Sequence, residues 1–495
     1  MNVTIDQAIV DIIEYGVEKT YIHPLDRILK QNQLLALLQK DSLVDDISPS
    51  SPLPEAKDLL PIFVEHGRSS GLIDDSPTEQ MIFTAQVMAF LTPDPSALND
   101  HFWKKYQETP AVATDYFYQL SMDNDYIQTE AIAKNIQFHY DSDYGDLELT
   151  INLSKPEKDP KAIAAARTVV TAHYPKCQLC VENEGYKGNL QHPARANHRI
   201  VRFPLNEEIW GLQYSPYAYY TEHCIFLAEE HRPMKIGEHT FRNLLAIVGQ
   251  FPHYFAGSNA DLPIVGGSIL SHDHYQGGRY TFAMEKAPLI STFKVAGFPD
   301  ITGGMVKWPL SVIRLEGSNP ETLVEASTHI LEKWRAYSDE TVGIHAFTND
   351  TPHNTITPIA RRNGEQYVMD LVLRNNRTTE TYPDGLFHPH PDVQHIKKEN
   401  IGLIEVMGLA ILPPRLKEEL ADVADYLLGE TQSINPIHLD WADSIPVAEH
   451  ATREEVEQAV EQAVGAVFQR VLEDAGVFKL DETGLAAFER FIKNL

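Results

Sequence analysis

The chain has 495 residues, of which 43% are hydrophobic and 22% charged, so it can bury large cores, and its length suggests two or three domains. Its 41 Lys and Arg against 70 Asp and Glu leave a net charge of −29. Such an acidic chain disfavours general binding to nucleic acids or anionic membranes, although a local basic pocket can still hold one phosphorylated small molecule. Because the sequence lacks a long apolar stretch and a signal-peptide pattern, we expect a cytoplasmic protein.

Residues 1–135 are predicted to form a helical N-terminal extension. Capping-box patterns at Thr4 and Ser76 mark the starts of two helices, and Pro77 suits the first position of the second helix. Met81–Leu91 forms an apolar helical face. This segment carries no chemical motif, which favours a role in packing or in an interface.

The rest of the chain is predicted to have an α+β fold on mainly antiparallel sheets. Residues 136–300 form a first unit, residues 301–430 a second unit of similar order, and residues 431–495 a helical C-terminal tail. In the first unit, a helix at 237–250 is expected among strands at 146–153, 199–203, 209–214, 224–228, 253–255 and 268–282. In the second unit and the tail, we expect a strand at 312–315, a helix at 321–337, a hairpin of 355–361 with 366–373, an apolar run at 401–412 and a helix capped by Thr452 and Glu455.

The most informative motif is Gly266–Gly278, in which glycine pairs flank two histidines and a glutamine. If the segment is extended, His272, His274 and Gln276 share one face while the residues between them point away. Glycines such as Gly267 let a ligand approach backbone N–H groups, which suits a phosphate. Three polar groups on one face are costly to bury without partners, so the pattern indicates a binding or reaction site.

A second His-x-His pattern, His388 and His390, is followed by Asp392 and flanked by prolines instead of glycines. This composition predicts a loop, with room for a substrate contact.

Cys177 and Cys180 have the C-x-x-C spacing. Three cysteines cannot form a disulfide framework, and in a reducing compartment this spacing indicates a metal site, a redox site or simple buried thiols. A zinc site needs two further ligands, and a closed four-ligand site is structural. The candidate histidines are His223, His231 and His272.

These motifs together resemble the galactose-1-phosphate uridylyltransferase family, in its longer, second type found in bacteria. The resemblance covers essentially the whole chain and is carried by the two motifs above and by residues 192–199, 228–233, 353–362 and 397–408. It implies membership of the histidine-triad superfamily, with two related half-barrel units. It also implies a homodimer.

The resemblance further implies a ping-pong reaction in the Leloir pathway of galactose catabolism. His274 would attack the α-phosphorus of UDP-glucose, release glucose 1-phosphate and become a uridylyl-histidine. Galactose 1-phosphate would then take the uridylyl group and leave as UDP-galactose. Gln276 would donate its amide to a non-bridging phosphoryl oxygen, where it cannot act as an acid or a base.

The remaining site residues are carried over in the same way. The expected zinc ligands are Cys177, Cys180, His231 and His272. The expected substrate contacts are Asn259, Gly267 and Ser268. Cations that can form a local positive pocket for the phosphates lie in the segments that carry the resemblance, and each has a solvated surface role as its alternative: Arg195, Arg199, Arg361, Arg362, Lys397 and Lys398. The chain departs from the short-chain type at Asp273, where that type has proline, and at Ser268, which lies one position farther from the first histidine.

Two other functions fit part of the pattern. A histidine-triad dinucleotide phosphorylase or adenylyltransferase would share the covalent chemistry but use another base and acceptor. A non-catalytic nucleotide-sugar-binding protein would share the fold without the reaction.

Overall fold

The computed structural model describes residues 3–154, 174–189, 191–267 and 269–495. Contacts divide this part of the chain into two compact units. Unit 1 contains residues 3–130, 174–218 and 224–231, and unit 2 contains residues 131–154, 219–223 and 232–495, apart from the two single positions left out above. The four-segment division expected from the sequence stays a prediction.

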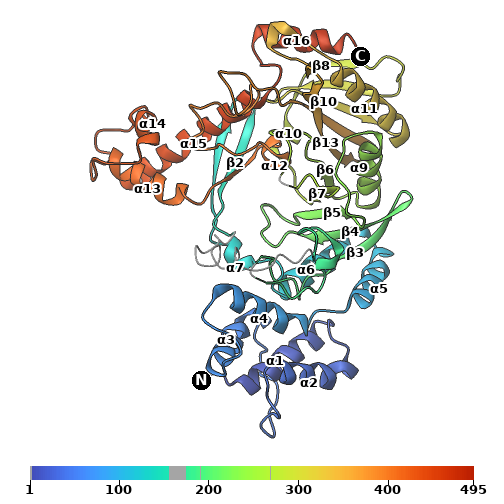
Figure 1. Ribbon diagram of the computed structural model, residues 1–495, viewed down its shortest axis with the longest axis vertical. Coiled ribbons are helices and arrows are strands. Elements are labelled where there is room, and N and C mark those ends of the chain that lie inside the picture. Colours follow the sequence, from blue (N-terminus) through green and yellow to red (C-terminus); the bar gives the residue numbers. More distant parts are fainter. Residues whose placement is uncertain (1–2, 155–173, 190, 268) are drawn as a thin grey trace. The chain divides into compact units, whose positions relative to one another are not determined.

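Unit 1 begins with the predicted helices, drawn in blue in Figure 1. Thr4 caps the first of them, since its hydroxyl accepts a hydrogen bond from the Gln7 N–H at 3.2 Å. The predicted capping box at Ser76 is wrong, because the Ser76 side chain makes no capping hydrogen bond. The Glu79 carboxylate accepts a hydrogen bond from the Asp74 N–H group instead. The helices are α1 (Ile5–Glu18), α2 (Arg27–Leu37), α3 (Leu60–Ser69), α4 (Pro77–Ala89), α5 (Pro95–Tyr106), α6 (Pro110–Asp123) and the short α7 (Thr129–Ile132), which runs on into unit 2.

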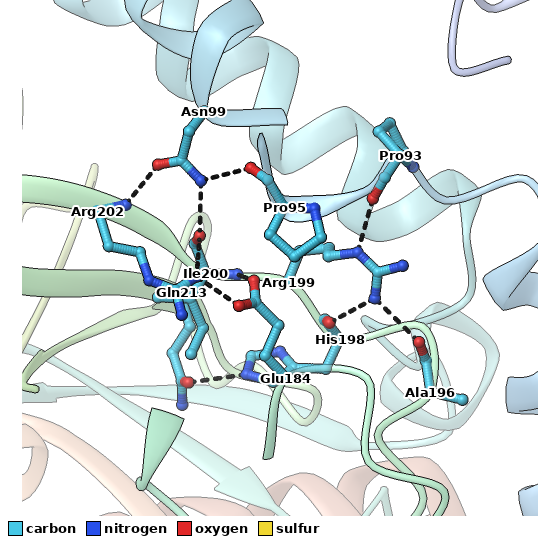
Figure 2. A network of polar contacts seen from close by, with 10 residues as sticks. All are labelled: Pro93, Pro95, Asn99, Glu184, Ala196, His198, Arg199, Ile200, Arg202 and Gln213. Carbon is cyan, nitrogen blue, oxygen red and sulfur yellow. Dashed lines mark hydrogen bonds and ion pairs between the residues drawn. The ribbon is translucent and has the colours of Figure 1, made fainter. Parts of the chain in front are cut away.

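Unit 1 also contains three antiparallel strands, β3 (Val201–Leu205), β4 (Glu208–Tyr214) and β5 (Cys224–Ala228). Helix α5 is tied to β3 by Asn99, whose Oδ1 accepts from the Arg202 N–H at 2.7 Å (Figure 2). Glu184, which follows the C-x-x-C loop, accepts from the Ile200 N–H at 2.7 Å. These contacts hold the C-x-x-C loop beside the start of β3.

Unit 2 contains an antiparallel sheet covered on one face by two helices. Helices α9 (Glu238–Gln250) and α11 (Pro320–Arg335) contact each other and strand β13 of this sheet (Figure 1). Both helices were predicted. Within unit 2 the strand order is β7 (His274–Gly278), β6 (Phe255–Gly257), β13 (Asn354–Asn363), β14 (Gln366–Asn375), β10 (Val312–Gly317), β9 (Thr302–Val306) and β8 (Leu289–Lys294).

A second, smaller sheet joins β1 (Ile136–Ser142), β2 (Gly145–Ile151) and the parallel β15 (Leu409–Leu412). Helix α15 (Arg453–Ala475) packs on β1, and its predicted capping box at Thr452 is confirmed. The remaining elements of unit 2 are α10 (Ala283–Lys286), β11 (Phe347–Thr348), β12 (Thr351–Pro352), α12 (Leu403–Val406), α13 (Leu416–Leu427), α14 (Leu439–Asp443) and α16 (Glu482–Ile492).

The α+β class with mainly antiparallel sheets is therefore confirmed, and the hairpin of β13 with β14 pairs Asn363 with Gln366. The strand expected at 268–282 is shorter than predicted, because β7 begins only at His274. Just before it, the Asp273 N–H donates to the carbonyl of Arg232 instead of to a neighbouring strand. None of the helices in the described ranges combines the length and the apolar character that crossing a membrane requires.

Candidate active site and metal-ligand group

The strand β7 begins with a buried histidine, His274. Its Nδ1 lies 2.7 Å from the carbonyl oxygen of His272, and a carbonyl oxygen only accepts, so Nδ1 carries the proton. Nε2 therefore holds the lone pair, as a nucleophilic imidazole requires. Burial is the main reason that the pKa of His274 is lowered to about 4. The ring is neutral at pH 7.

Gln276 lies two residues along the same strand and is only partly exposed. Its Oε1 lies 3.0 Å from Nε2 of His223. His223 is buried, and desolvation lowers its pKa to about 4, so this ring is also neutral at pH 7. His223 is thus engaged with Gln276 rather than with the cysteines.

Asn259 follows the neighbouring strand. The register pairs Gly257, the last residue of β6, with Gln276, and Asn259 lies two residues beyond that strand end. The Oδ1 of Asn259 accepts from the Leu403 N–H at 2.9 Å. His274 and Gln276 therefore share strand β7, and Asn259 lies just beyond the end of the strand that pairs with β7.

Gly267 packs directly on the Asn259 amide. A Cβ at this glycine would stand 2.6 Å from Nδ2 of Asn259, closer than real Cβ contacts come. Asn259 is buried and held at Leu403, so it cannot move away cheaply. The absence of a side chain at Gly267 thus leaves the space that the Asn259 amide fills. The sequence predicted a contact of Gly267 with the substrate, but not this packing role.

Replacing Gly267 by alanine is expected to lower kcat by about 10-fold or more, because the added methyl group displaces the Asn259 amide. Steady-state kinetics of the variant check this. Gly237, which has an extended backbone and where an added Cβ would meet only the His239 side chain at 3.4 Å, gives the matched control. Wild-type kinetics for Gly267→Ala would show that Asn259 has no part in the reaction.

The C-x-x-C motif of unit 1 places Cys177 and Cys180 with their Sγ atoms 3.4 Å apart, and His231 Nδ1 lies 3.0 Å from the Cys180 sulfur. These donors can hold a metal ion. Asn183 fixes the loop, since its Nδ2 donates to the carbonyls of both cysteines at 2.8 and 2.9 Å. Desolvation and the neighbouring thiol raise the pKa of Cys180 to about 12, so a bound cation is what would favour its thiolate. His272, the remaining predicted ligand, is fully buried in unit 2.

Two of the predicted phosphate-binding arginines lie in unit 1. Arg199 is buried, and its Nε donates to the Pro93 carbonyl at 2.6 Å while Nη1 donates to two carbonyls of its own loop (Figure 2). This arrangement joins two segments of backbone and gives Arg199 a structural role. Arg195 lies over the ring of Tyr126, 5.5 Å from its centroid.

The other two predicted cations are already paired inside unit 2. Arg361 donates to Asp370 at 2.6 Å, and Lys397 donates to Glu405 at 3.0 Å. Both side chains are buried. Asp370 also pairs with Arg314 at 2.7 Å, and Glu285 lies 3.5 Å from Arg361, so the two arginines share two carboxylates. The contact of Arg361 and Lys397 with phosphate stays a prediction, as does that of Ser268, which lies outside the described residues.

The second His-x-His pattern lies in a segment without helix or strand, as predicted. His390 Nδ1 lies 3.3 Å from the Asp474 carboxylate, and with Asp392 these residues form a second group of potential metal ligands. Arg470 pairs with both carboxylates, at 3.2 and 3.7 Å. The guanidinium group of Arg470 therefore already supplies a positive charge to these two carboxylates.

Sequence reasoning missed the contact between His223 and Gln276. The two residues are 53 positions apart, and His223 stands before an apolar strand without any motif around it. The only available signal was its place among the histidines near the cysteine motif, which suggested a metal ligand instead.

Two family models match the chain. Residues 20–233 match the model for the N-terminal domain of galactose-1-phosphate uridyl transferase, and residues 247–443 match the model for its C-terminal domain. A galactose-1-phosphate uridylyltransferase of Streptococcus mutans is 55% identical over 97% of this chain and 97% of its own. One from Streptococcus pneumoniae is 54% identical over 100% and 99%, and one from Ligilactobacillus salivarius is 54% identical over 99% of each chain.

Among solved structures, a yeast Ap4A phosphorylase, Apa2, aligns with 60% of this chain and 89% of its own. The identity is 13% and the TM-score 0.32, too low to support any conclusion about function.

Proposed function

The chain belongs to the galactose-1-phosphate uridylyltransferase family, and on this premise we propose that it transfers UMP from UDP-glucose to galactose 1-phosphate. It is a nucleotidyltransferase. The observation that carries the proposal is the buried, neutral imidazole of His274, whose Nδ1 proton is held by a backbone carbonyl.

In the first half-reaction, the Nε2 lone pair of His274 attacks the α-phosphorus of UDP-glucose. A P–N bond forms and the bond from this phosphorus to the bridging oxygen breaks, so glucose 1-phosphate leaves with the electron pair. In the second half-reaction, a phosphate oxygen of galactose 1-phosphate attacks the same phosphorus. The P–N bond breaks, UDP-galactose forms and the lone pair returns to Nε2.

The amides beside His274 stabilise the negative charge on the non-bridging oxygens of the reacting phosphoryl group. Gln276 donates N–H groups to a non-bridging oxygen, and such a donor contributes about 10²- to 10³-fold to kcat. We expect Asn259, two residues beyond the strand end that pairs with Gln276, to contact the same phosphoryl group. Both amides stay neutral at every relevant pH, so neither delivers a proton to the leaving group.

We propose that the metal is zinc and that His272 is the fourth ligand beside Cys177, Cys180 and His231. Two sulfur and two nitrogen donors are a common set for structural Zn²⁺. The ion would stabilise the fold and fix the position of His272. The backbone carbonyl of His272 accepts the hydrogen bond from the Nδ1–H group of His274. It takes no step in the reaction.

The lowered pKa of His274 predicts how the first half-reaction depends on pH. A pKa of about 4 lies below the ordinary value near 6.5, so the ring keeps its lone pair between pH 8 and about pH 5.5. The single-turnover rate with UDP-glucose is expected to stay constant over this range and to fall only towards pH 4. An acid limb centred near 6.5 would contradict it. Circular dichroism at each pH is needed to confirm that the protein is folded. The buried histidines bind protons more readily in the unfolded chain, so the free energy of unfolding decreases as the pH falls from about 6.5 towards 4.

The rival dinucleotide phosphorylase uses the same covalent chemistry with another substrate. Incubation with UDP-glucose and galactose 1-phosphate is expected to yield UDP-galactose and glucose 1-phosphate. Incubation with diadenosine tetraphosphate and phosphate is expected to yield no product. The reverse pattern would assign the chain to the rival reaction, and no product in either mixture would favour a binding protein.

A further inference from the structure

His223 is hydrogen-bonded to the side-chain oxygen of Gln276. The distance from His223 Nε2 to Gln276 Oε1 is 3.0 Å, and both residues belong to unit 2. His223 Nδ1 is buried and has no hydrogen-bond partner among the described residues. The direction of the hydrogen bond decides what the amide presents to a substrate.

The unpartnered Nδ1 identifies the tautomer. If Nδ1 carried the proton, an N–H group would be buried without an acceptor, which is rarer and costlier than a buried lone pair without a donor. The proton therefore sits on Nε2, which donates to Oε1 of Gln276. This assignment turns the Gln276 NH₂ group away from His223.

We propose that His223 is a positioning residue, which fixes the Gln276 amide so that its N–H groups, and not its carbonyl oxygen, face the reacting phosphoryl group. The inference rests on the proposed function. A flipped amide would put its carbonyl oxygen against a negatively charged phosphoryl oxygen, so holding the orientation stabilises the transition state without any contact between His223 and the substrate.

The backbone around His223 is built against β7. The Tyr220 hydroxyl donates to the carbonyl of Gly277 at 3.1 Å. Gly278 lies so close to residue 222 that a Cβ would stand 2.7 Å from the Glu222 carbonyl oxygen. The His223 ring is also stacked on Tyr219, with 5.5 Å between the ring centroids. Segment 219–223 therefore cannot slide along the strand, and the histidine stays opposite Gln276.

The first test removes the donor but keeps an aromatic ring in the stack. His223→Phe is expected to lower kcat about 10- to 100-fold, and kcat/KM for UDP-glucose by the same factor, because the lost interaction acts in the transition state. His223→Gln, which offers an amide N–H at a similar reach, is expected to restore at least half of this loss on a logarithmic scale. A His223→Phe enzyme with wild-type kcat would overturn the inference.

A double-mutant cycle separates positioning from a general loss of structure. Gln276→Ala alone is expected to lower kcat about 100- to 1000-fold, and adding His223→Phe to it should change kcat less than about twofold. If the two losses multiply instead, His223 acts independently of Gln276 and the inference is wrong.

His438 provides the matched control, since it is another fully buried histidine of unit 2, with Nε2 3.0 Å from Glu419. His438→Phe is expected to lower the melting temperature while kcat stays within about twofold. A failure of the proposed function itself has another outcome, in which the wild-type protein forms no UDP-galactose from UDP-glucose and galactose 1-phosphate.

Discussion

Replacing His274 by asparagine is expected to abolish uridylyl transfer, with kcat lower by about 10⁴-fold or more. Asparagine is polar and fits the space, but its amide nitrogen has no available lone pair for attack on phosphorus. The first half-reaction should disappear together with the complete reaction. Rapid-quench measurement of glucose 1-phosphate released from UDP-glucose in a single turnover checks both.

Tyr275→Phe is the control for damage to strand β7. This neighbouring residue is buried, and its hydroxyl accepts from Asn243 on helix α9 at 3.1 Å. Removing the hydroxyl is expected to leave kcat within about threefold. If His274→Asn keeps more than a tenth of wild-type kcat in a folded protein, His274 is not the nucleophile.

Loss of one metal ligand is expected to have the second-largest effect, on stability as well as activity. Cys180→Ser should release the bound zinc and lower the free energy of unfolding by several kcal/mol, since the binding energy of a structural ion is part of the folding energy. Metal analysis and thermal unfolding, each with and without added zinc, measure the two effects. In wild-type protein, a chelator should lower the melting temperature in the same way.

Cys224→Ala is the matched cysteine control. Cys224 lies on β5, is fully buried and does not belong to the group of donors. This variant is expected to keep its zinc, although it loses some stability at a buried position. Fully active wild-type protein that contains less than a tenth of an equivalent of zinc would contradict the metal proposal and leave the nucleophile unaffected.

Local periodicity predicted many of the elements. Leu147, Leu149 and Ile151 alternate with polar residues and form β2, and the apolar stripe at Val456, Val460 and Val464 is the buried face of α15. The partner of β2 was missed although Ile136, Phe138 and Tyr140 alternate with polar residues. This alternation is the local signal that could have found the strand, of which only Phe138 is buried.

The site was predictable where the motif is local. His274 and Gln276 are two residues apart on one strand, so the sequence already placed them together. The partners of charged residues were not predictable: Arg361 pairs with Asp370 on the adjacent strand β14, and Arg314 on β10 pairs with the same carboxylate. His223 is a similar case, since only the tertiary fold brings it to Gln276. The sequence around a charged residue or a histidine does not reveal which distant group pairs with it in the fold.

The most direct test of the covalent reaction is mass spectrometry of the protein after incubation with UDP-glucose alone. The account predicts one uridylyl group per chain, located by peptide sequencing on His274, and its removal when galactose 1-phosphate is added. Unmodified protein that nevertheless forms UDP-galactose from both substrates, or a label on any other residue, would contradict it.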